Sequence, residues 1–584
     1  MEGARPLAAK RYRQQSPSSA TTVSAARDWM CCLGLLAFLA VFYGLLQNGF
    51  WYPGNDSELY VSLARSIAAG DGYKFNGLPV AKVPPGWPLV LAAAIKLSPS
   101  FAFLNTLTLS FLLVTAGLWY WILRRFTTPR RVLLVMLIAG TLFPWYRLTF
   151  LLHSDALFCI LFAGSLLLAC QIAEGRSAPW RILLLAAMCG ALVTVRWAGV
   201  IIWIVIAAAL LRRQIRPTWS RQWVAVALTA AATVGAFIGT RAGLSALASR
   251  ELASPQMQDM LAETADAALK IETTLAKPYA ISPSGGVLPY FYRIGDSGSW
   301  LTWLLWQPAE LGASYRPLGH LVNAFGWVLI LLVAVYVVDT VRQRQWLWLG
   351  VLLYCGALCS RWSHPNTRYL VPVLPLLLTG MYWGAEHVWL SLRSVGVRRA
   401  VRVAVGALIV SIVVCNFGIF ATDLWVAWQD DFYASYRAGQ CDNLIAAACY
   451  LDRHAAADDA IAVNSEYVNL NRLRKNSFGF RAASMLTHRK IRLVPQDVCR
   501  NRPDGALIAW ANNREKAIRF YLCRVPVEPW RLGHFRVPRL QEWVTGQAAG
   551  PPSPYFELYE LTADGPVSIV PADCGDWPRR VPGL

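Results

Sequence analysis

Residues 101–123 read FAFLNTLTLSFLLVTAGLWYWIL, a stretch without a charged side chain. A helix needs about 20 apolar residues to cross about 30 Å of hydrocarbon, so this stretch predicts a transmembrane helix. Arg124 and Arg125 follow it directly, and Arg130 and Arg131 come soon after. Arginine collects in the cytoplasmic loops of membrane proteins, which places this end of the helix in the cytoplasm.

Comparable apolar runs recur through most of the chain. Only 15% of the 584 residues are charged, whereas about a quarter are charged in soluble proteins. The sequence therefore predicts a polytopic α-helical membrane protein with about eleven transmembrane helices in its 29–421 part. The predicted spans are 29–50, 101–123, 132–150, 153–173, 181–196, 197–212, 222–244, 319–341, 345–361, 368–390 and 401–421. In the 181–212 part, Arg196 interrupts what would be two short helices.

Arginine marks every second gap between these spans. The five gaps contain Arg124, Arg125, Arg130 and Arg131; Arg176 and Arg181; Arg212, Arg213, Arg216 and Arg221; Arg342 and Arg344; and Arg393, Arg398, Arg399 and Arg402. The pattern predicts a multi-pass protein of a plasma membrane or bacterial inner membrane. Its basic 1–28 tail is then cytoplasmic, the first span is an uncleaved signal anchor, and the C-terminus is extracytoplasmic.

Three segments then lie outside: 52–100, 244–319 and 422–584. In the second, 251–276 has a helical composition. The third has β-like runs at 460–463, 491–495, 506–510 and 555–561, with a helical pattern at 443–454. It predicts a small extracytoplasmic α/β domain. Its five cysteines favour one or two disulfides in an oxidising compartment.

The charge distribution argues against nucleic acid as a partner. The net charge is +21, but from residue 422 onward 20 basic residues face 18 acidic ones. The excess positive charge therefore belongs to the membrane portion and its tails, and not to one soluble binding module.

The first outer segment contains the most informative motif. It reads Pro53-Gly-Asn-Asp-Ser-Glu-Leu-Tyr60, then ARSIAAGDGY from residue 64, then AKVPPGWP from residue 81. Asn55 or Asp56 can cap a helix that begins near Ser57, and Gly70 ends it. The helix is too short to span and is expected to lie along the membrane surface. A carboxylate at its start, Asp56 or Glu58, is well placed to take a proton from a hydroxyl, or simply to be a solvated cap.

This loop resembles the first periplasmic loop of the GT-C membrane glycosyltransferases, in particular the family 39 group that includes the lipid A aminoarabinose transferases and the protein O-mannosyltransferases. The shared features are an acidic residue after the first span, Tyr60 four residues later, a glycine-containing turn, and a Pro-Pro segment. A second motif, RYLVPVLP from Arg368, resembles the start of a late span in that family. The resemblance implies that Asp56 is the catalytic acid or base and that a polyprenyl-phosphate-linked sugar is the donor.

Two features depart from the family pattern. Ser57 separates Asp56 from the second acid, Glu58, and Val83 separates Lys82 from the Pro-Pro segment. Lys82 is expected either to contact a phosphate or to extend from the interface as a structural lysine.

A second polar group stands between the third and fourth spans, in YRLTFLLHSD from residue 146 to residue 155. Ionisable residues at membrane depth face a cavity or each other. Arg147, His153 and Asp155 are therefore expected to cluster beneath the first loop. The resemblance places an acidic residue of this turn in the active-site region, so Asp155 is the second catalytic candidate. The alternatives are a structural Asp155–Arg147 pair and a locally satisfied His153.

Cationic side chains at the outer ends of spans complete the predicted site. A phosphate leaving group needs positive charge, and arginine contacts phosphate with two donors. The residues assigned to substrate or phosphate binding are Glu58, Tyr60, Lys82, Arg147, Arg196, Arg368 and Tyr369. His364 and Arg361 share the last outer loop and are less specific. No cofactor is indicated. Sequence spacing supplies no dedicated metal-ligand pattern, and a divalent metal site would require the fold to bring Asp56 together with Glu58, Asp155 or His364.

The predicted function is transfer of a sugar from a polyprenyl-phosphate carrier to an acceptor hydroxyl at the outer membrane face. The acceptor is a glycan, a lipid or a protein, and the bilayer is the other partner. Two alternatives remain. The first is a transporter or flippase of a lipid-linked glycan, and the second is a polysaccharide polymerase or ligase centred on the 244–319 loop.

Overall fold

The computed structural model describes residues 22–51, 56–211, 219–253, 316–343, 345–361, 367–392, 394–428, 442–456, 459–464, 490–494, 507, 511, 518–524, 556–562, 565–569 and 580–582. Most of the expected helix at 251–276 lies outside these ranges. Asn55 and His364 lie outside them entirely.

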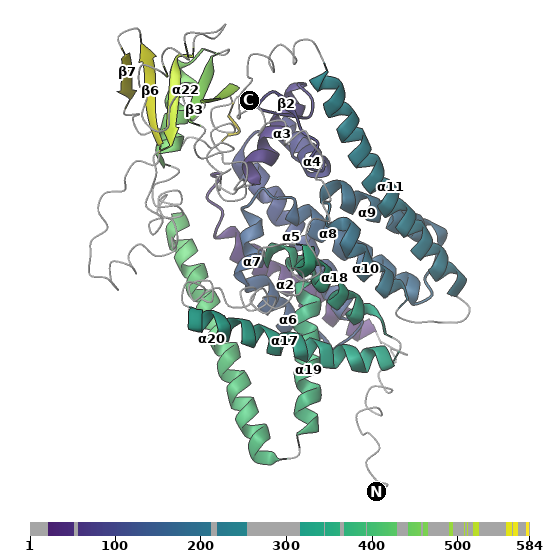
Figure 1. Cartoon of the computed structure of the whole chain (residues 1–584). Coiled ribbons are helices and arrows are strands. Elements are labelled where there is room, and N and C mark those ends of the chain that lie inside the picture. The colour runs from purple at the N-terminus through teal and green to yellow at the C-terminus, as the bar shows by residue number, and fades with distance from the viewer. Residues whose placement is uncertain are drawn as a thin grey trace, which may run out of the picture.

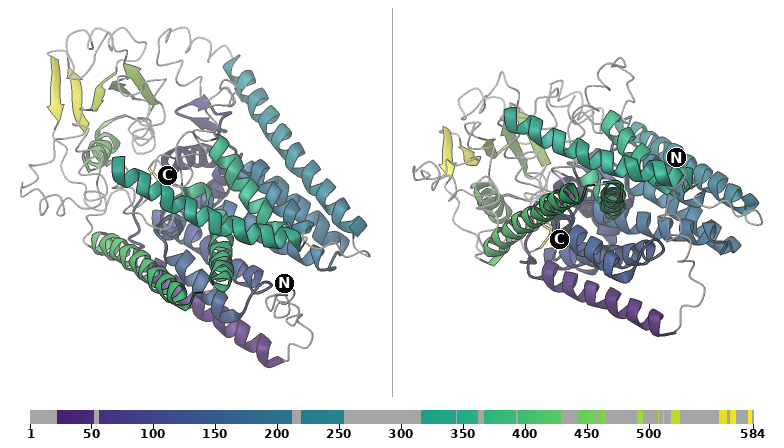
Figure 2. Two further views of the ribbon diagram at one scale, coloured as in Figure 1. Left: turned by 60° about the horizontal axis from the view of Figure 1, so that its bottom comes forward. Right: turned by 90° about the horizontal axis from the view of Figure 1, so that it is seen from below.

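Each predicted span overlaps a helix. These helices are α2 (Thr22–Gly44), α5 (Phe101–Leu123), α6 (Pro129–Thr141), α8 (Asp155–Ala173), α9 (Pro179–Val195), α10 (Gly199–Leu210), α11 (Trp219–Leu252), α17 (Arg316–Arg342), α18 (Leu347–Arg361), α19 (Leu374–Ser391) and α20 (Val395–Trp428). They form one bundle in which α5 packs on α8, and α9 packs on both α8 and α11 (Figures 1 and 2).

Apolar length identifies the spans that the structure supports directly. Within the described residues, five helical segments are long and apolar enough to cross a membrane: Ala25–Gly44, Phe101–Leu123, Asp155–Ala173, Ser220–Arg250 and Ala324–Arg342. A bent pair, Pro129–Thr141 with Phe143–Thr149, adds a sixth if it counts as one span. Shorter apolar helices include α9 and α10. The chain is a helical multi-pass membrane protein, and the count of eleven and the orientation stay predictions.

The predicted span 132–150 is not one continuous helix. It is divided into α6, the short helix α7 (Phe143–Tyr146) and the 3-10 turn η1 (Arg147–Thr149), with a 67° bend. Pro144 has no N–H, and its ring blocks a helical bond to the carbonyl four residues earlier, that of Gly140. The Tyr43 hydroxyl donates to the Gly140 carbonyl instead, at 3.0 Å. The bend thereby turns Arg147 and the following segment toward the first outer loop.

The interruption at Arg196 is real. Helix α9 ends at Val195, Arg196 is extended (φ −151°, ψ 137°), and α10 begins three residues later. Gly199 permits this tight junction, because a Cβ there would lie 2.8 Å from the Leu192 carbonyl oxygen. The side chains of Arg196 and Trp197 are consequently freed from helical packing and reach other segments.

The first outer segment folds into a compact unit. It consists of α3 (Ser57–Ala69), the hairpin β1 (Lys74–Phe75) and β2 (Leu78–Pro79), and α4 (Gly86–Leu97). Asn76 and Gly77 make the hairpin turn with φ of 54° and 81°, as an Asn-Gly turn requires. Gly70 ends α3 in the left-handed conformation (φ 88°), as predicted. Gly86 allows α4 to approach α9, since a Cβ there would lie 2.8 Å from the Thr194 carbonyl oxygen.

The C-terminal part contains α22 (Asp442–His454) and a five-stranded sheet. The strands are β3 (Ala460–Asn464), β4 (Lys490–Val494), β5 (Phe520–Arg524), β6 (Phe556–Thr562) and β7 (Gly565–Ile569), in the order β4-β3-β5-β6-β7. The β3 strand pairs in parallel with β4 and β5, and the remaining pairs are antiparallel. Three predicted β-runs and the helix are present. The run 506–510 is a correction, because Leu507 is helical and buried.

Alternation along the strands gives the sheet two apolar faces. Ile461 and Val463 join the same buried cluster as the membrane helices, whereas Ala462 and Tyr521 join a separate small cluster. Cys449 in α22 forms a disulfide, and the described cysteines of the helical bundle are free thiols. The sheet lies toward the same end of the bundle as α3 and α4 (Figure 1).

Candidate functional site

The N-terminal end of α3 presents a carboxylate to a distant arginine. Asp56 occupies the N-cap position (φ −100°, ψ −22°), but its side chain makes no capping hydrogen bond. Arg368 instead donates from Nη2 to Asp56 Oδ2 at 2.5 Å. Arg368 belongs to the 3-10 turn η3 (Thr367–Tyr369), just before α19. The two side chains are 26% and 24% exposed, so this ion pair is within reach of solvent and of a substrate.

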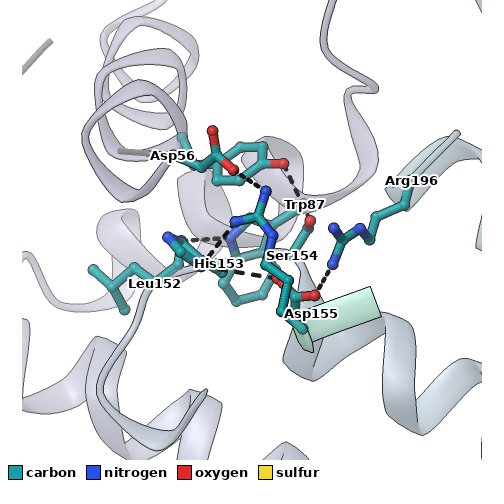
Figure 3. A network of polar contacts seen from close by, with 9 residues as sticks. Asp56, Trp87, Leu152, His153, Ser154, Asp155 and Arg196 are labelled. Carbon is teal, nitrogen blue, oxygen red and sulfur yellow. Dashed lines mark hydrogen bonds and ion pairs between the residues drawn. The ribbon is translucent and has the colours of Figure 1, made fainter. Parts of the chain in front are cut away.

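His153 lies behind this pair. Its Nδ1 is 3.5 Å from Arg368 Nη1 and 3.8 Å from the Asp155 carboxylate (Figure 3). Burial and then the neighbouring Arg368 guanidinium lower the pKa of His153 well below its ordinary 6.5. The imidazole is therefore neutral at pH 7, and a neutral Nδ1 can accept a hydrogen bond from Arg368.

A second ion pair lies deeper. Asp155, the first residue of α8, pairs with Arg196, and their side chains are 2% and 9% exposed. The Arg196 guanidinium also lies over the Tyr369 ring, 4.7 Å from its centroid, and Arg368 lies 5.4 Å from the same centroid. Tyr369 thus packs against both arginines, and the two ion pairs form one continuous polar cluster.

Tyr60 connects α3 to the same turn. Its hydroxyl lies 3.1 Å from Ser154 Oγ, and either oxygen can donate. Burial and then the Asp56 carboxylate raise the pKa of Tyr60, so the phenol keeps its proton. The residue one helical turn after Asp56 is therefore fixed to the residue between His153 and Asp155.

Two indoles hold the backbone around the cluster. Trp87 of α4 donates from Nε1 to the Leu152 carbonyl at 3.0 Å (Figure 3). Trp197 donates from Nε1 to the Lys82 carbonyl at 2.9 Å. The first bond joins the first outer segment to the His153 turn, and the second joins it to the α9–α10 junction. Trp87 and the Lys82 backbone therefore brace the segments that surround the cluster.

The remaining predicted residues are placed around this centre. Glu58 is completely buried in the first turn of α3, and Lys82 is half-buried between β2 and α4. Arg147 lies over the Phe143 ring, with its guanidinium carbon 5.3 Å from the centroid, and its charge adds to the field on His153. Arg361 ends α18, but its side chain lies outside the described residues.

The expected cluster of Arg147, His153 and Asp155 forms with a different arrangement. The ion-pair partner of Asp155 is Arg196 and not Arg147. The alternative of a structural Asp155–Arg147 pair is therefore not observed, and Arg196 comes from the junction of α9 and α10. Ser154 and Tyr354 were missed. The Tyr354 hydroxyl donates to the Tyr369 carbonyl at 2.8 Å, and nothing in the apolar sequence of α18 marks this tyrosine.

Among the described residues, no three His, Cys, Asp or Glu side chains gather closely enough to hold a metal ion. The cluster instead combines a reachable carboxylate, a neutral imidazole, two guanidinium groups and two phenols. Such a set can accept a proton from a hydroxyl and stabilise an anionic leaving group.

No family model matches the sequence, and no curated protein matches it. Two solved structures of ArnT from Cupriavidus metallidurans are similar to it. The structure bound to undecaprenyl phosphate has a TM-score of 0.48 and 12% identity, and the match covers 91% of this chain and 98% of that one. The apo structure has a TM-score of 0.46 and 15% identity, and the match covers 90% and 92%.

Proposed function

We propose that the protein is a membrane glycosyltransferase that moves a sugar from a polyprenyl-phosphate carrier to an acceptor hydroxyl at the extracytoplasmic face. The observation that carries this proposal is the Asp56–Arg368 pair. A carboxylate and a guanidinium, both partly exposed, meet where the first outer segment covers the ends of the helices. The sequence resemblance of 51–95 and of the Arg368 motif supports the same chemistry.

The reaction is a single displacement at the anomeric carbon. The acceptor oxygen forms a bond to this carbon, and the carbon–oxygen bond to the carrier phosphate breaks. The acceptor proton passes to the Asp56 carboxylate, and the electron pair of the broken bond leaves with the polyprenyl phosphate. Arg368 stabilises the charge that develops on the phosphate. Inversion of the anomeric configuration follows from one displacement.

The two carboxylates differ in exposure, and we assign them different roles. Asp56 is 26% exposed and can contact an acceptor. Asp155 is 2% exposed and paired with Arg196. Removing one partner of a buried pair leaves an uncompensated charge, so Asp155 is better suited to fix Arg196 and His153 than to exchange protons. We therefore propose Asp155 as a positioning residue, and Lys82, Tyr369 and Arg196 as groups around the phosphate.

Two observations support the outer face. The first outer segment lies toward the same end of the bundle as the sheet, and Cys449 in the same C-terminal part forms a disulfide. Disulfides persist in oxidising compartments. The alternating arginine-bearing gaps then assign the opposite end to the cytoplasm.

The test is mass spectrometry of envelope glycans from cells with and without the protein, after complementation by wild type, Asp56→Asn or Asp71→Asn. Asp71 is an exposed carboxylate in the same segment. Wild type and Asp71→Asn are expected to restore the missing sugar. Asp56→Asn, which removes the base and leaves the fold, is expected to lower transfer by about 10²–10⁴-fold.

Full activity of a well-expressed Asp56→Asn protein would refute the mechanism. Movement of an intact lipid-linked glycan across the membrane, without formation of a glycosidic bond, would establish the flippase alternative. Growth of polymer chains would establish the polymerase alternative.

A further inference from the structure

Residues 580–582 lie against the first outer segment, far from it in sequence. Arg580 forms an isolated antiparallel bridge with Ser100. The Val581 amide donates to the Pro99 carbonyl at 2.8 Å. The Pro582 carbonyl accepts a hydrogen bond from Arg65 Nη1 at 3.1 Å, across 517 residues of sequence. We call residues 580–582 the strap.

Two of the three strap residues, Val581 and Pro582, are buried. Val581 is completely buried and belongs to the same apolar cluster as Leu59 and Leu63 of α3. Arg65 is partly buried, and this burial lowers its pKa to about 10. A guanidinium that loses part of its hydration needs hydrogen-bond acceptors, because losing hydration without replacement costs free energy. The Pro582 carbonyl is one such acceptor, so the strap and Arg65 depend on each other.

Helix α3 has little local stability of its own, so its contacts with other segments matter for its position. It has 13 residues, and isolated helices shorter than about 12–15 residues are marginal in water. The cap at its start is absent, because the Asp56 side chain is turned toward Arg368. The strap holds Arg65 in the C-terminal half of α3, and Ser154 holds Tyr60 in its first turn. Rotation or sliding of α3 would move Asp56 and Tyr60 together.

We propose that the strap and Arg65 are positioning elements that fix α3 so that Asp56 is held at the acceptor side of the site. This inference rests on the proposed function for its kinetic part only. The phosphate-binding arginines Arg196 and Arg368 lie on other segments. Loss of the strap therefore slows turnover and leaves binding of the polyprenyl phosphate unchanged.

The first experiment tests the docking by itself. Directly paired residues of antiparallel strands have Cα atoms about 4.5–5.5 Å apart, within the range of about 4.4–6.8 Å that a disulfide spans. The full-length double variant Ser100→Cys with Arg580→Cys, purified in nanodiscs, is expected to cross-link on mild oxidation. Peptide mass spectrometry identifies the bond, and Arg580→Cys alone controls for the native thiols. Absence of the cross-link would refute the proposal.

The second experiment measures what docking does. Arg65→Met removes the guanidinium, and Val581→Pro removes the amide donor. Each is expected to lower kcat at least tenfold, with Kd for polyprenyl phosphate by native mass spectrometry within twofold of wild type. Arg580→Ala is the control, because Arg580 is exposed and contributes backbone to the bridge. It is expected to keep the wild-type rate, and so is the cross-linked double variant.

The outcomes separate the two proposals. An inactive cross-linked enzyme would overturn the strap as a positioning element, because the strap would then have to leave during turnover. Unchanged kcat in both Arg65→Met and Val581→Pro would overturn it as well. If the wild type transfers no sugar, the proposed function fails alone. The strap is then tested by hydrogen exchange of the α3 amides, which is expected to accelerate at least tenfold in Arg65→Met.

Discussion

At the scale of single residues, Asp56 stands at a position where aspartate usually stabilises its own helix. An N-cap side chain satisfies one amide of the first turn and contributes about 0.5–2 kcal/mol. In this chain the Asp56 carboxylate makes no capping hydrogen bond and accepts one from Arg368 instead. The helix gives up local stability so that a charge can be placed against a group 312 residues away. Such a conflict between local preference and observed geometry is typical of functional sites.

Arg368 is expected to contribute geometry as well as charge. Arg368→Gln should weaken binding of polyprenyl phosphate and lower transfer by about 10²–10³-fold, because the leaving group loses its cation. The transfer rate of Arg368→Lys should lie between those of the wild type and Arg368→Gln, since lysine keeps the charge but lacks the planar guanidinium. Native mass spectrometry and transfer rates measure both effects. The exposed control Arg519→Gln should leave them unchanged, and equal activity of all three variants would contradict the assignment.

His153 predicts a pH dependence with a defined sign. Arg368, Arg147, Arg196, Asp56 and Asp155 surround it, and burial lowers its pKa well below 6.5. As the pH falls through 6.5, the unfolded chain binds a proton that the folded chain does not, so this residue makes the protein less stable toward acid. At pH 7.5 and above the effect is absent.

Thermal unfolding between pH 5 and pH 8 measures this dependence. The His153→Gln variant cannot titrate at this position, and it should lose less stability than wild type as the pH falls from 7.5 to 5.5. Identical slopes for the two proteins would show that His153 is not held neutral.

At the scale of elements, the α6–α7 bend depends on one hydroxyl. Tyr43 satisfies the Gly140 carbonyl that Pro144 leaves without its helical partner. Tyr43→Phe keeps the ring and removes the donor, so a buried carbonyl becomes unsatisfied at a cost of about 1–3 kcal/mol. Thermal unfolding in detergent should show the loss. Tyr382→Phe, at an exposed ring, is the matched control and should unfold like wild type. An unchanged melting temperature for Tyr43→Phe would indicate another partner for the carbonyl.

Helices and their ends were predictable where the local sequence carries a single clear signal. The span of 101–123, the stop at Gly70 and the helix at 443–454 follow from local sequence, and the structure has all three. The bend within 132–150 was not predicted, because apolar character continues across Pro144 and hides the break. The run 506–510 has a strand-like composition, yet Leu507 is helical, since burial on the sheet suits either conformation.

The candidate site was predictable in its members and not in its pairs. Acidic and basic residues at membrane depth stand out in an apolar sequence, so Asp56, Asp155, Arg196 and Arg368 could be named. Which carboxylate meets which arginine depends on helix packing, so the sequence left a structural Asp155–Arg147 pair open, whereas Asp155 pairs with Arg196. Ser154 and Tyr354 carry no charge and so gave no signal.

At the scale of the whole molecule, the cluster draws on four separate stretches: 56–60, 153–155, Arg196 and 368–369. Each reaches the centre through a break in regular structure. These breaks are the start of α3, the turn before α8, the α9–α10 junction and the 3-10 turn before α19. Irregular backbone at membrane depth is tolerated where protein surrounds it. The bundle therefore supplies a regular framework, and its interruptions carry the charged side chains of the cluster.

The distance in sequence between Asp56 and Arg368 also determines when their ion pair can form during synthesis of the chain. At roughly 5–20 residues per second, the ribosome needs about 15–60 s to make the 312 residues that separate them. During that interval the Asp56 carboxylate has no Arg368 to meet, and capping its own helix is the remaining local option. The nascent chain therefore inserts with an ordinary surface helix. The Asp56–Arg368 pair can form only after the segment before α19 has been made, so a shorter nascent chain lacks this ion pair.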